Sequence, residues 1–95
     1  MNRTNLLTGR IRRRDGMLTS DLGDGIAVMD LNQYRYLALN ATAAATWQRL
    51  DVPSRFDEII AGLCTEFDVP EATCRKQVTE LLDRLLSDGL IMIEE

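Results

Sequence analysis

Histidine is absent from this chain of 95 residues, and cysteine and proline occur only twice each. Histidine is the commonest general base and the commonest metal ligand of proteins, so its absence argues against acid–base catalysis and against a metal site. Cys64 and Cys74 lie too far apart to form a zinc motif by themselves, and we interpret both as small core hydrophobes. The acidic side chains are scattered over solvated faces. We therefore expect no catalytic residue, no metal and no cofactor, and a protein that is not an enzyme.

Long apolar runs are also missing. No stretch is long enough to span a membrane, and the N-terminus is polar and lacks a signal-peptide pattern. We expect a cytoplasmic protein with reduced thiols that makes no membrane contact. Hydrophobic residues make up 45% of the chain, which is enough for the single core of one domain.

Charge is distributed unevenly along the chain. Residues 1–50 carry seven basic and four acidic residues, whereas residues 51–95 carry four basic and eleven acidic ones. The acidic second half argues against a nucleic-acid partner. Four arginines gather at Arg10, Arg12, Arg13 and Arg14. They predict a flexible basic segment over residues 1–16 ahead of a domain over residues 17–95. The alternative is a basic arm that touches an acidic partner.

Three strands are predicted in the first half of the domain, over residues 17–22, 26–31 and 34–39. Glycine at positions 23 and 25 and the Asn32–Gln33 pair indicate the two turns between them. Short connections favour an antiparallel meander, in which the nearly continuous apolar second strand is central and the third strand lies at an edge.

The hydrophobic period changes to 3.6 residues from Asn40 onward, and Asn40 is a suitable helix N-cap. Breaks at residues 51–53 and 68–70 divide the remainder into three helices. Ser54 is expected to cap the second helix, with Asp57 completing a capping box. Gly89 is expected to end the third helix, with a short closing strand over residues 90–93. The fold class is therefore α+β, a three-stranded antiparallel sheet followed by three helices.

The apolar arc of the third helix is wider than one core contact requires. Two adjoining flanks share it, one formed by Cys74, Val78, Leu81 and Leu85 and the other by Arg75, Thr79, Leu82 and Leu86. The second flank either packs on the sheet as a wide core face or lines a groove beside it.

The segment from Tyr34 to Asn40 alternates aromatic and aliphatic residues at the expected edge. An edge strand offers unpaired N–H and C=O groups to an extended peptide. Tyr34 and Tyr36 are suitable anchors because aromatic rings dominate interface hot spots. Arg35 could pair with an acidic residue of the peptide, although an exposed pair contributes only about 0–1 kcal/mol.

Several short segments together resemble the PqqD-like family. They are Gly-Ile-Ala-Val-Met-Asp at 25–30, Tyr-Leu-Ala-Leu-Asn at 36–40, Ala44 with Trp47, Phe-Asp-Glu-Ile-Ile at 56–60, Phe-Asp-Val at 67–69 and Leu-Leu-Ser-Asp-Gly-Leu-Ile at 85–91. No single motif is specific, but their order and spacing together are. The similarity covers about residues 17–93.

The resemblance implies a winged helix-turn-helix-like unit that recognises ribosomally synthesised, post-translationally modified peptides. It also implies that the leader of a precursor adds as a strand on the third strand, in a groove shared with the third helix. The peptide-binding residues expected on this basis are Tyr34, Arg35, Tyr36, Leu37, Ala38, Arg75, Val78, Thr79, Leu82 and Leu86.

Two partner systems are compatible with this resemblance. The first is a split lasso-peptide B system, in which a stand-alone leader-binding protein works with a separate leader peptidase. The second is pyrroloquinoline quinone biosynthesis, in which a peptide chaperone works with a radical-SAM enzyme. The stretch from Asp30 to Asn40 looks more like the first, and it lacks the Pro-Glu pair that is frequent in the second.

A DNA-binding winged helix is the hypothesis from another class. Its recognition helix would be the third helix, which carries four acidic and three basic residues: Glu71, Arg75, Lys76, Glu80, Asp83, Arg84 and Asp88. A helix that enters a DNA groove should be basic, so the sequence disfavours this function.

Overall fold

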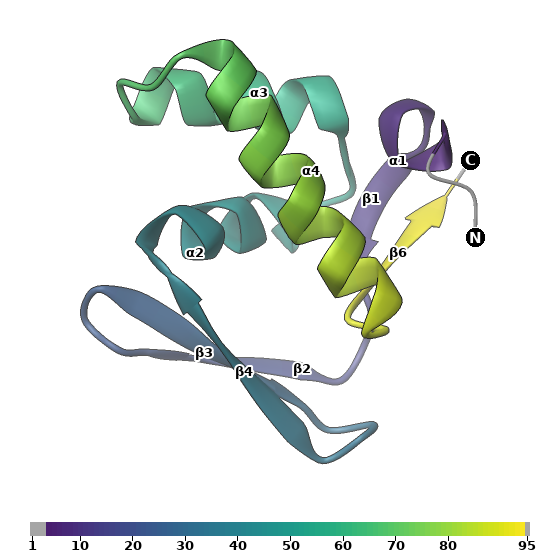
Figure 1. The fold of residues 1–95 in the computed structure, drawn as a ribbon. Helices are drawn as coiled ribbons and strands as arrows, with labels where there is room; N and C mark the ends of the chain where they lie inside the picture. Colours follow the sequence, from purple (N-terminus) through teal and green to yellow (C-terminus); the bar gives the residue numbers. More distant parts are fainter. Residues whose placement is uncertain (1–3, 95) are drawn as a thin grey trace.

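Two three-stranded antiparallel sheets and three longer helices form the fold, which a computed structural model describes over residues 4–94 (Figure 1). The elements are α1 (Thr4–Thr8), β1 (Arg10–Arg13), β2 (Met17–Asp21), β3 (Gly25–Asp30), β4 (Arg35–Asn40), α2 (Ala41–Gln48), the 3-10 helix η1 (Arg49–Asp51), β5 (Ser54–Arg55), α3 (Phe56–Glu66), α4 (Glu71–Ser87) and β6 (Ile91–Glu94). The predicted α+β class and the order of a meander followed by three helices are confirmed. Within residues 4–94, no helix is both long and apolar enough to cross a bilayer.

The predicted meander is the sheet β2-β3-β4, with β3 in the centre and β4 at one edge. Strands β2 and β3 are joined by a tight turn in which the Asp21 carboxylate accepts a hydrogen bond of 2.7 Å from the Gly23 amide. Gly25 is required at the start of β3, because a Cβ atom there would collide with the carbonyl oxygen of Leu39 on β4. Both predicted turns therefore set the register of the sheet.

The second sheet, β5-β1-β6, was not predicted as a sheet. Residues 10–13 were expected to belong to a flexible basic segment, but they form β1, which pairs along its length with β6. Ile11 on this strand is fully buried, and so is Leu6 of α1. This strand forms because it pairs with the closing strand β6. It was not predicted because Ile11 is a single apolar residue among arginines, so the local sequence lacks a strand pattern. Residues 1–3 of the expected segment lie outside the described residues.

The charged side chain of Arg13 is half-buried and packs against the core of this fold. Its guanidinium lies 4.7 Å from the ring centroid of Trp47 and donates hydrogen bonds of 3.1 and 2.6 Å to the Trp47 carbonyl oxygen. Burial lowers the pKa of Arg13 from its ordinary value, and the charge of Asp51 partly opposes that shift. Arg13 therefore holds β1 against the C-terminal end of α2.

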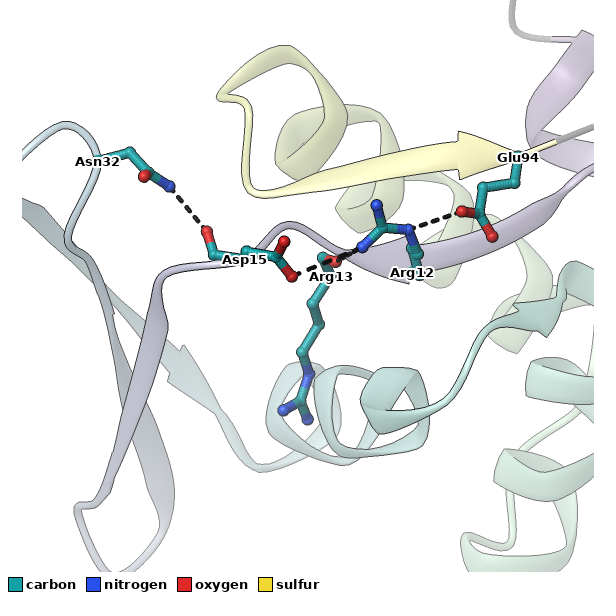
Figure 2. Close-up of polar contacts among 5 residues, drawn as sticks. All are labelled: Arg12, Arg13, Asp15, Asn32 and Glu94. Carbon is teal, nitrogen blue, oxygen red and sulfur yellow. Dashed lines mark hydrogen bonds and ion pairs between the residues drawn. The ribbon is translucent and has the colours of Figure 1, made fainter.

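Polar contacts hold the connection between the two sheets in place (Figure 2). The Arg12 Nε atom donates a hydrogen bond of 2.9 Å to Glu94 on β6, and Arg12 Nη1 lies 3.9 Å from the Asp15 carboxylate. The Asn32 side chain, from the turn before β4, donates a bond of 2.8 Å to the Asp15 carbonyl oxygen. The link between β1 and β2 is thus anchored to both sheets.

The helix ends follow their predicted signals with one shift. Asn40 caps α2 as predicted, because its side-chain oxygen accepts a hydrogen bond of 3.0 Å from the Ala43 amide. At α3 the cap is Arg55, whose amide donates to the Glu58 carboxylate at 2.8 Å, so the predicted Ser54–Asp57 box is displaced by one residue. Ser54 instead belongs to β5, which pairs with β1.

The core lies between the sheet β2-β3-β4 and the helices. Trp47, Phe56, Leu82 and Leu85 are among its largest fully buried side chains. Helix α4 crosses this core and ends at Ser87, and Gly89, which follows the C-cap residue Asp88, has the positive φ of 79° expected just after a helix. The arrangement places α4 beside the free edge of β4 (Figure 1).

Candidate functional site

The hydrogen bonds between β2 and β3 fix the direction of every backbone group in the sheet. The amide of Leu22 donates to the carbonyl of Gly25, and the amide of Leu31 donates to the carbonyl of Gly16, both at 2.9 Å. Odd-numbered residues of β3 therefore direct their N–H and C=O groups toward β2. Because these groups alternate along a strand, the even-numbered residues of β3 direct theirs toward β4.

The register then identifies the backbone groups of β4 that are free. The partners of Ile26 and Val28 on β4 are Leu39 and Leu37, so these two residues face β3. Ala38 lies between them and Tyr36 precedes Leu37, so both have the opposite orientation and their N–H and C=O groups point away from the sheet. Within residues 4–94, β4 pairs with β3 alone, so this row is open to an added strand.

The side chains of β4 divide between two faces. Leu39 is buried and Leu37 packs against the core, so odd-numbered positions face the helices. Tyr36 is 72% exposed on the opposite face, together with Ala38. Tyr34 was expected to share the strand with Tyr36, but it lies in the turn before β4, with a φ of 55° and 88% of its surface exposed.

The turn before β4 is fixed by Asp30, a fully buried carboxylate. It accepts hydrogen bonds from the Asn32 amide at 2.9 Å, from the Gln33 amide at 3.3 Å and from the Gln33 side chain at 2.9 Å. The same Gln33 side chain lies 3.2 Å from the Asp88 carbonyl oxygen at the end of α4. These bonds satisfy the buried charge and set the start of β4 relative to α4.

A groove of about 380 Å³ lies along the second half of β4, between this strand, α2 and α4. On the strand side it begins at Ala38, whose backbone is free. On the helix side it is formed by Gln77, Val78, Glu80, Leu81 and Arg84. An extended chain added to β4 would run beside this wall, which combines the apolar Val78 and Leu81 with the polar or charged Gln77, Glu80 and Arg84.

The predicted helix residues mostly lie elsewhere. Of the five α4 positions expected to bind a peptide, only Val78 lines the groove. Leu82 is fully buried in the core, and Leu86 packs against the core. Arg75 turns toward α3, where it lies over the Phe56 ring at 5.1 Å from the centroid.

Thr79 is also not among the residues that line the groove, and its hydroxyl donates a bond of 2.7 Å to the Arg75 carbonyl oxygen of its own helix. The residues that line the wall instead, Gln77, Leu81 and Arg84, repeat at the i, i+4, i+7 spacing of one helix face. That spacing was present in the sequence. Because only Leu81 of these three residues is apolar, a prediction based on apolar flanks does not identify this helix face.

Arg35 is tied to the protein rather than free for a peptide. Its guanidinium donates a hydrogen bond to the Asp88 carbonyl oxygen at the end of α4. A small cavity of about 90 Å³ lies beside it, lined by Val28, Tyr36, Leu37 and others. Arg35 therefore joins the start of β4 to the end of α4 and walls a pocket large enough for part of a side chain.

The two cysteines lie away from the groove, between α3 and α4. Cys74 is buried and Cys64 packs at the margin of the core, as small hydrophobes do. Burial raises the pKa of the Cys74 thiol, and a hydrogen bond with Cys64 adds to that shift. Both thiols are free.

The comparison with known protein families covers the part of the chain that forms the groove. The family model of coenzyme PQQ synthesis protein D (PqqD) matches residues 25–91, from β3 to the first residue of β6. No curated protein sequence gives a significant match.

Two solved structures share the fold. "TbiB1 in Complex with the TbiA(beta) Leader Peptide" has a TM-score of 0.76 and 22% identity, covering 84% of this chain and 93% of that one. "Lasso peptide synthetase B1 complexed with the leader peptide" has a TM-score of 0.73 and 23% identity, covering 86% of this chain and 96% of that one.

Proposed function

The chain belongs to the PqqD family, and from this membership we propose that it binds the leader peptide of a ribosomally synthesised, post-translationally modified precursor as an additional strand on β4. The observation that carries the proposal is the open backbone edge at Tyr36 and Ala38 beside the groove of about 380 Å³. The two structurally similar proteins are each complexed with a leader peptide, which supports leader binding here.

Backbone pairing supplies the affinity of this mode and side-chain pockets supply its specificity. Tyr36 and Ala38 each offer one N–H donor and one C=O acceptor, and each bond formed contributes about 0.5–1.5 kcal/mol net. Successive leader residues point to opposite faces. One set enters the groove against Val78 and Leu81, and the other lies on the exposed face beside the Tyr36 ring.

The partner that receives the leader is proposed to be a separate maturation enzyme, a leader peptidase of the lasso-peptide type. The sequence contains no histidine, the commonest general base, which favours a role in which this protein holds the substrate while another protein performs the chemistry. Its likeness to a lasso peptide synthetase B1 favours this class of partner.

A second candidate is a peptide chaperone for pyrroloquinoline quinone biosynthesis that works with a radical-SAM enzyme. The observation in its favour is the matching family model, which is that of coenzyme PQQ synthesis protein D. Titrating the chain with a lasso-peptide leader and with the peptide precursor of the quinone separates the two functions, because only the cognate peptide should bind tightly.

Hydrogen exchange tests the proposed binding mode. Adding the cognate leader peptide, identified by titration of lasso-peptide leaders and of the quinone precursor, should slow exchange of the Tyr36 and Ala38 amides. The amide of Thr19 is the internal control, because it faces outward from β2 at the opposite edge of the same sheet. Unchanged exchange at Tyr36 and Ala38 under saturating leader would refute addition on β4.

A further inference from the structure

The sheet β2-β3-β4 has one face turned away from the helices, and its centre is a continuous apolar row. The register pairs Leu18 with Met29 and Met29 with Tyr36, so one side chain from each strand lies in line. These side chains are 58%, 39% and 72% exposed. We name this surface the outer face. Leu22 and Leu31 are also exposed, just beyond the ends of β2 and β3.

No charged residue lies on the outer face within the three strands. Their charged residues are Asp21, Asp30 and Arg35, and the alternation places all three on the side of the helices. A solvated sheet face ordinarily carries charges that keep it soluble and unpaired. An apolar and uncharged face of this kind is typical of a surface that contacts another protein.

The size of the outer face indicates a transient contact. With about 150–250 Å² for a large side chain, the exposed fractions of the row and its two flanking leucines correspond to roughly 500 Å² of apolar surface. A stable interface buries about 800 Å² on each partner. The outer face is therefore too small for a permanent dimer of this chain, and it suits a partner that binds and leaves.

The outer face is also continuous with the proposed leader site. A leader strand on β4 would extend the sheet by one strand, and every second leader side chain would join Tyr36 and Ala38 on this same face. The face would then consist of three strands of the protein and one strand of substrate. A partner that docks here would contact the carrier and the leader at once.

We propose that the outer face is the docking surface for an apolar patch on the maturation enzyme, which is recruited to the protein and leader together. This inference rests on the proposed leader binding. It adds a second site, separate from the groove and centred on Leu18 and Met29 rather than on β4 and α4.

Leu18→Lys tests the inference, because Leu18 is on β2, which β3 and β4 separate from the leader. The variant should bind the leader with unchanged affinity in a fluorescence-anisotropy titration. It should lower the rate at which the cognate leader peptidase processes its precursor by about tenfold or more, the effect of removing an interface hot spot. Leu7→Lys is the matched control, since Leu7 is 52% exposed on α1, and it should change neither quantity.

Circular dichroism verifies folding, and Leu18→Gln replaces Leu18→Lys if the lysine variant is unfolded. Full processing by a folded variant with unchanged leader affinity would overturn the docking surface while leaving leader binding intact. A dimer of the unaltered chain that Leu18→Lys dissociates in sedimentation equilibrium would also overturn it, because a second copy would then cover the face. If the unaltered chain binds no leader, the proposed function fails first and this inference fails with it.

Discussion

Proline substitutions at two adjacent positions of β4 should have opposite effects. Proline lacks the backbone N–H, and a sheet tolerates it only where that N–H would face solvent at an edge. The Leu37 amide faces β3, whereas the Tyr36 amide faces outward. We expect Leu37→Pro to disrupt the internal ladder and Tyr36→Pro to leave the fold intact while removing one donor for the leader.

The magnitude follows from the number of bonds lost. Tyr36→Pro removes one donor of the proposed ladder, worth about 0.5–1.5 kcal/mol net, which corresponds to roughly a two- to tenfold loss of affinity. Ala38→Pro should act in the same way, because its amide has the same phase. The double variant should lose roughly five- to a hundredfold if the two bonds contribute independently.

Leader affinity is measured by fluorescence anisotropy, and thermal unfolding by circular dichroism reports on the fold. Tyr36→Ala keeps the amide and so separates loss of the ring from loss of the donor. Thr19→Pro removes an outward amide from β2 at the other edge, and it should leave leader affinity unchanged. The reasoning would be refuted if Tyr36→Pro and Ala38→Pro both folded and bound the leader like the unaltered chain.

Three further outcomes test individual side chains. Leu82→Ala should lower the free energy of unfolding in urea by about 2–5 kcal/mol, because Leu82 is fully buried; little or no loss would show that it lies outside the core. Leu81→Gln should stay folded but bind the leader more weakly in the anisotropy titration, since Leu81 lines the groove; unchanged binding would remove it from the site. Arg13→Ala should cost about 1–3 kcal/mol in the same urea experiment, because its charged hydrogen bonds to Trp47 are lost. The exposed Arg14→Ala control should stay within about 0.5 kcal/mol, and equal effects of the two would contradict the assigned role of Arg13.

Local signals predicted much of the fold. The glycine turn after β2, the Asn40 cap and the Gly89 cap each act through backbone geometry within a few residues, so the sequence shows them directly. The edge position of β4 followed from the short connections of the meander. These features depend on neighbouring residues alone, and they were the features predicted best.

The features that were missed depend on residues far apart in the sequence. Strand β1 exists because it pairs with β6 at the other end of the chain, and no local pattern around Ile11 announces that partner. Which flank of α4 faces β4 could not be read from the sequence for a related reason. The orientation of α4 is set by Leu82 and Leu85 packing into the core, and only that packing turns Gln77 and Arg84 toward β4.

The sheet β2-β3-β4 has two edges with the same backbone chemistry, and the surrounding side chains favour β4. Asp21 lies on the β2 edge, and Asp24 and Glu66 also line the cavity of about 550 Å³ beside it. Glu66 is paired with Arg49 at 2.9 Å, but a peptide entering there would have to desolvate Asp21 and Asp24. That costs free energy unless new partners satisfy them, and charged residues are a common protection of sheet edges.

The charged residues at the start of β4 are already occupied within the protein, and Glu80 and Arg84 lie across the groove on α4. Asp30 is satisfied by the turn, and Arg35 donates to the end of α4. The open residues Tyr36 and Ala38 carry no charge that must be desolvated when a strand is added. The protein thus protects one edge of its sheet and leaves the other available, and leader-dependent protection of the Thr19 amide in place of the Tyr36 amide would reverse that assignment.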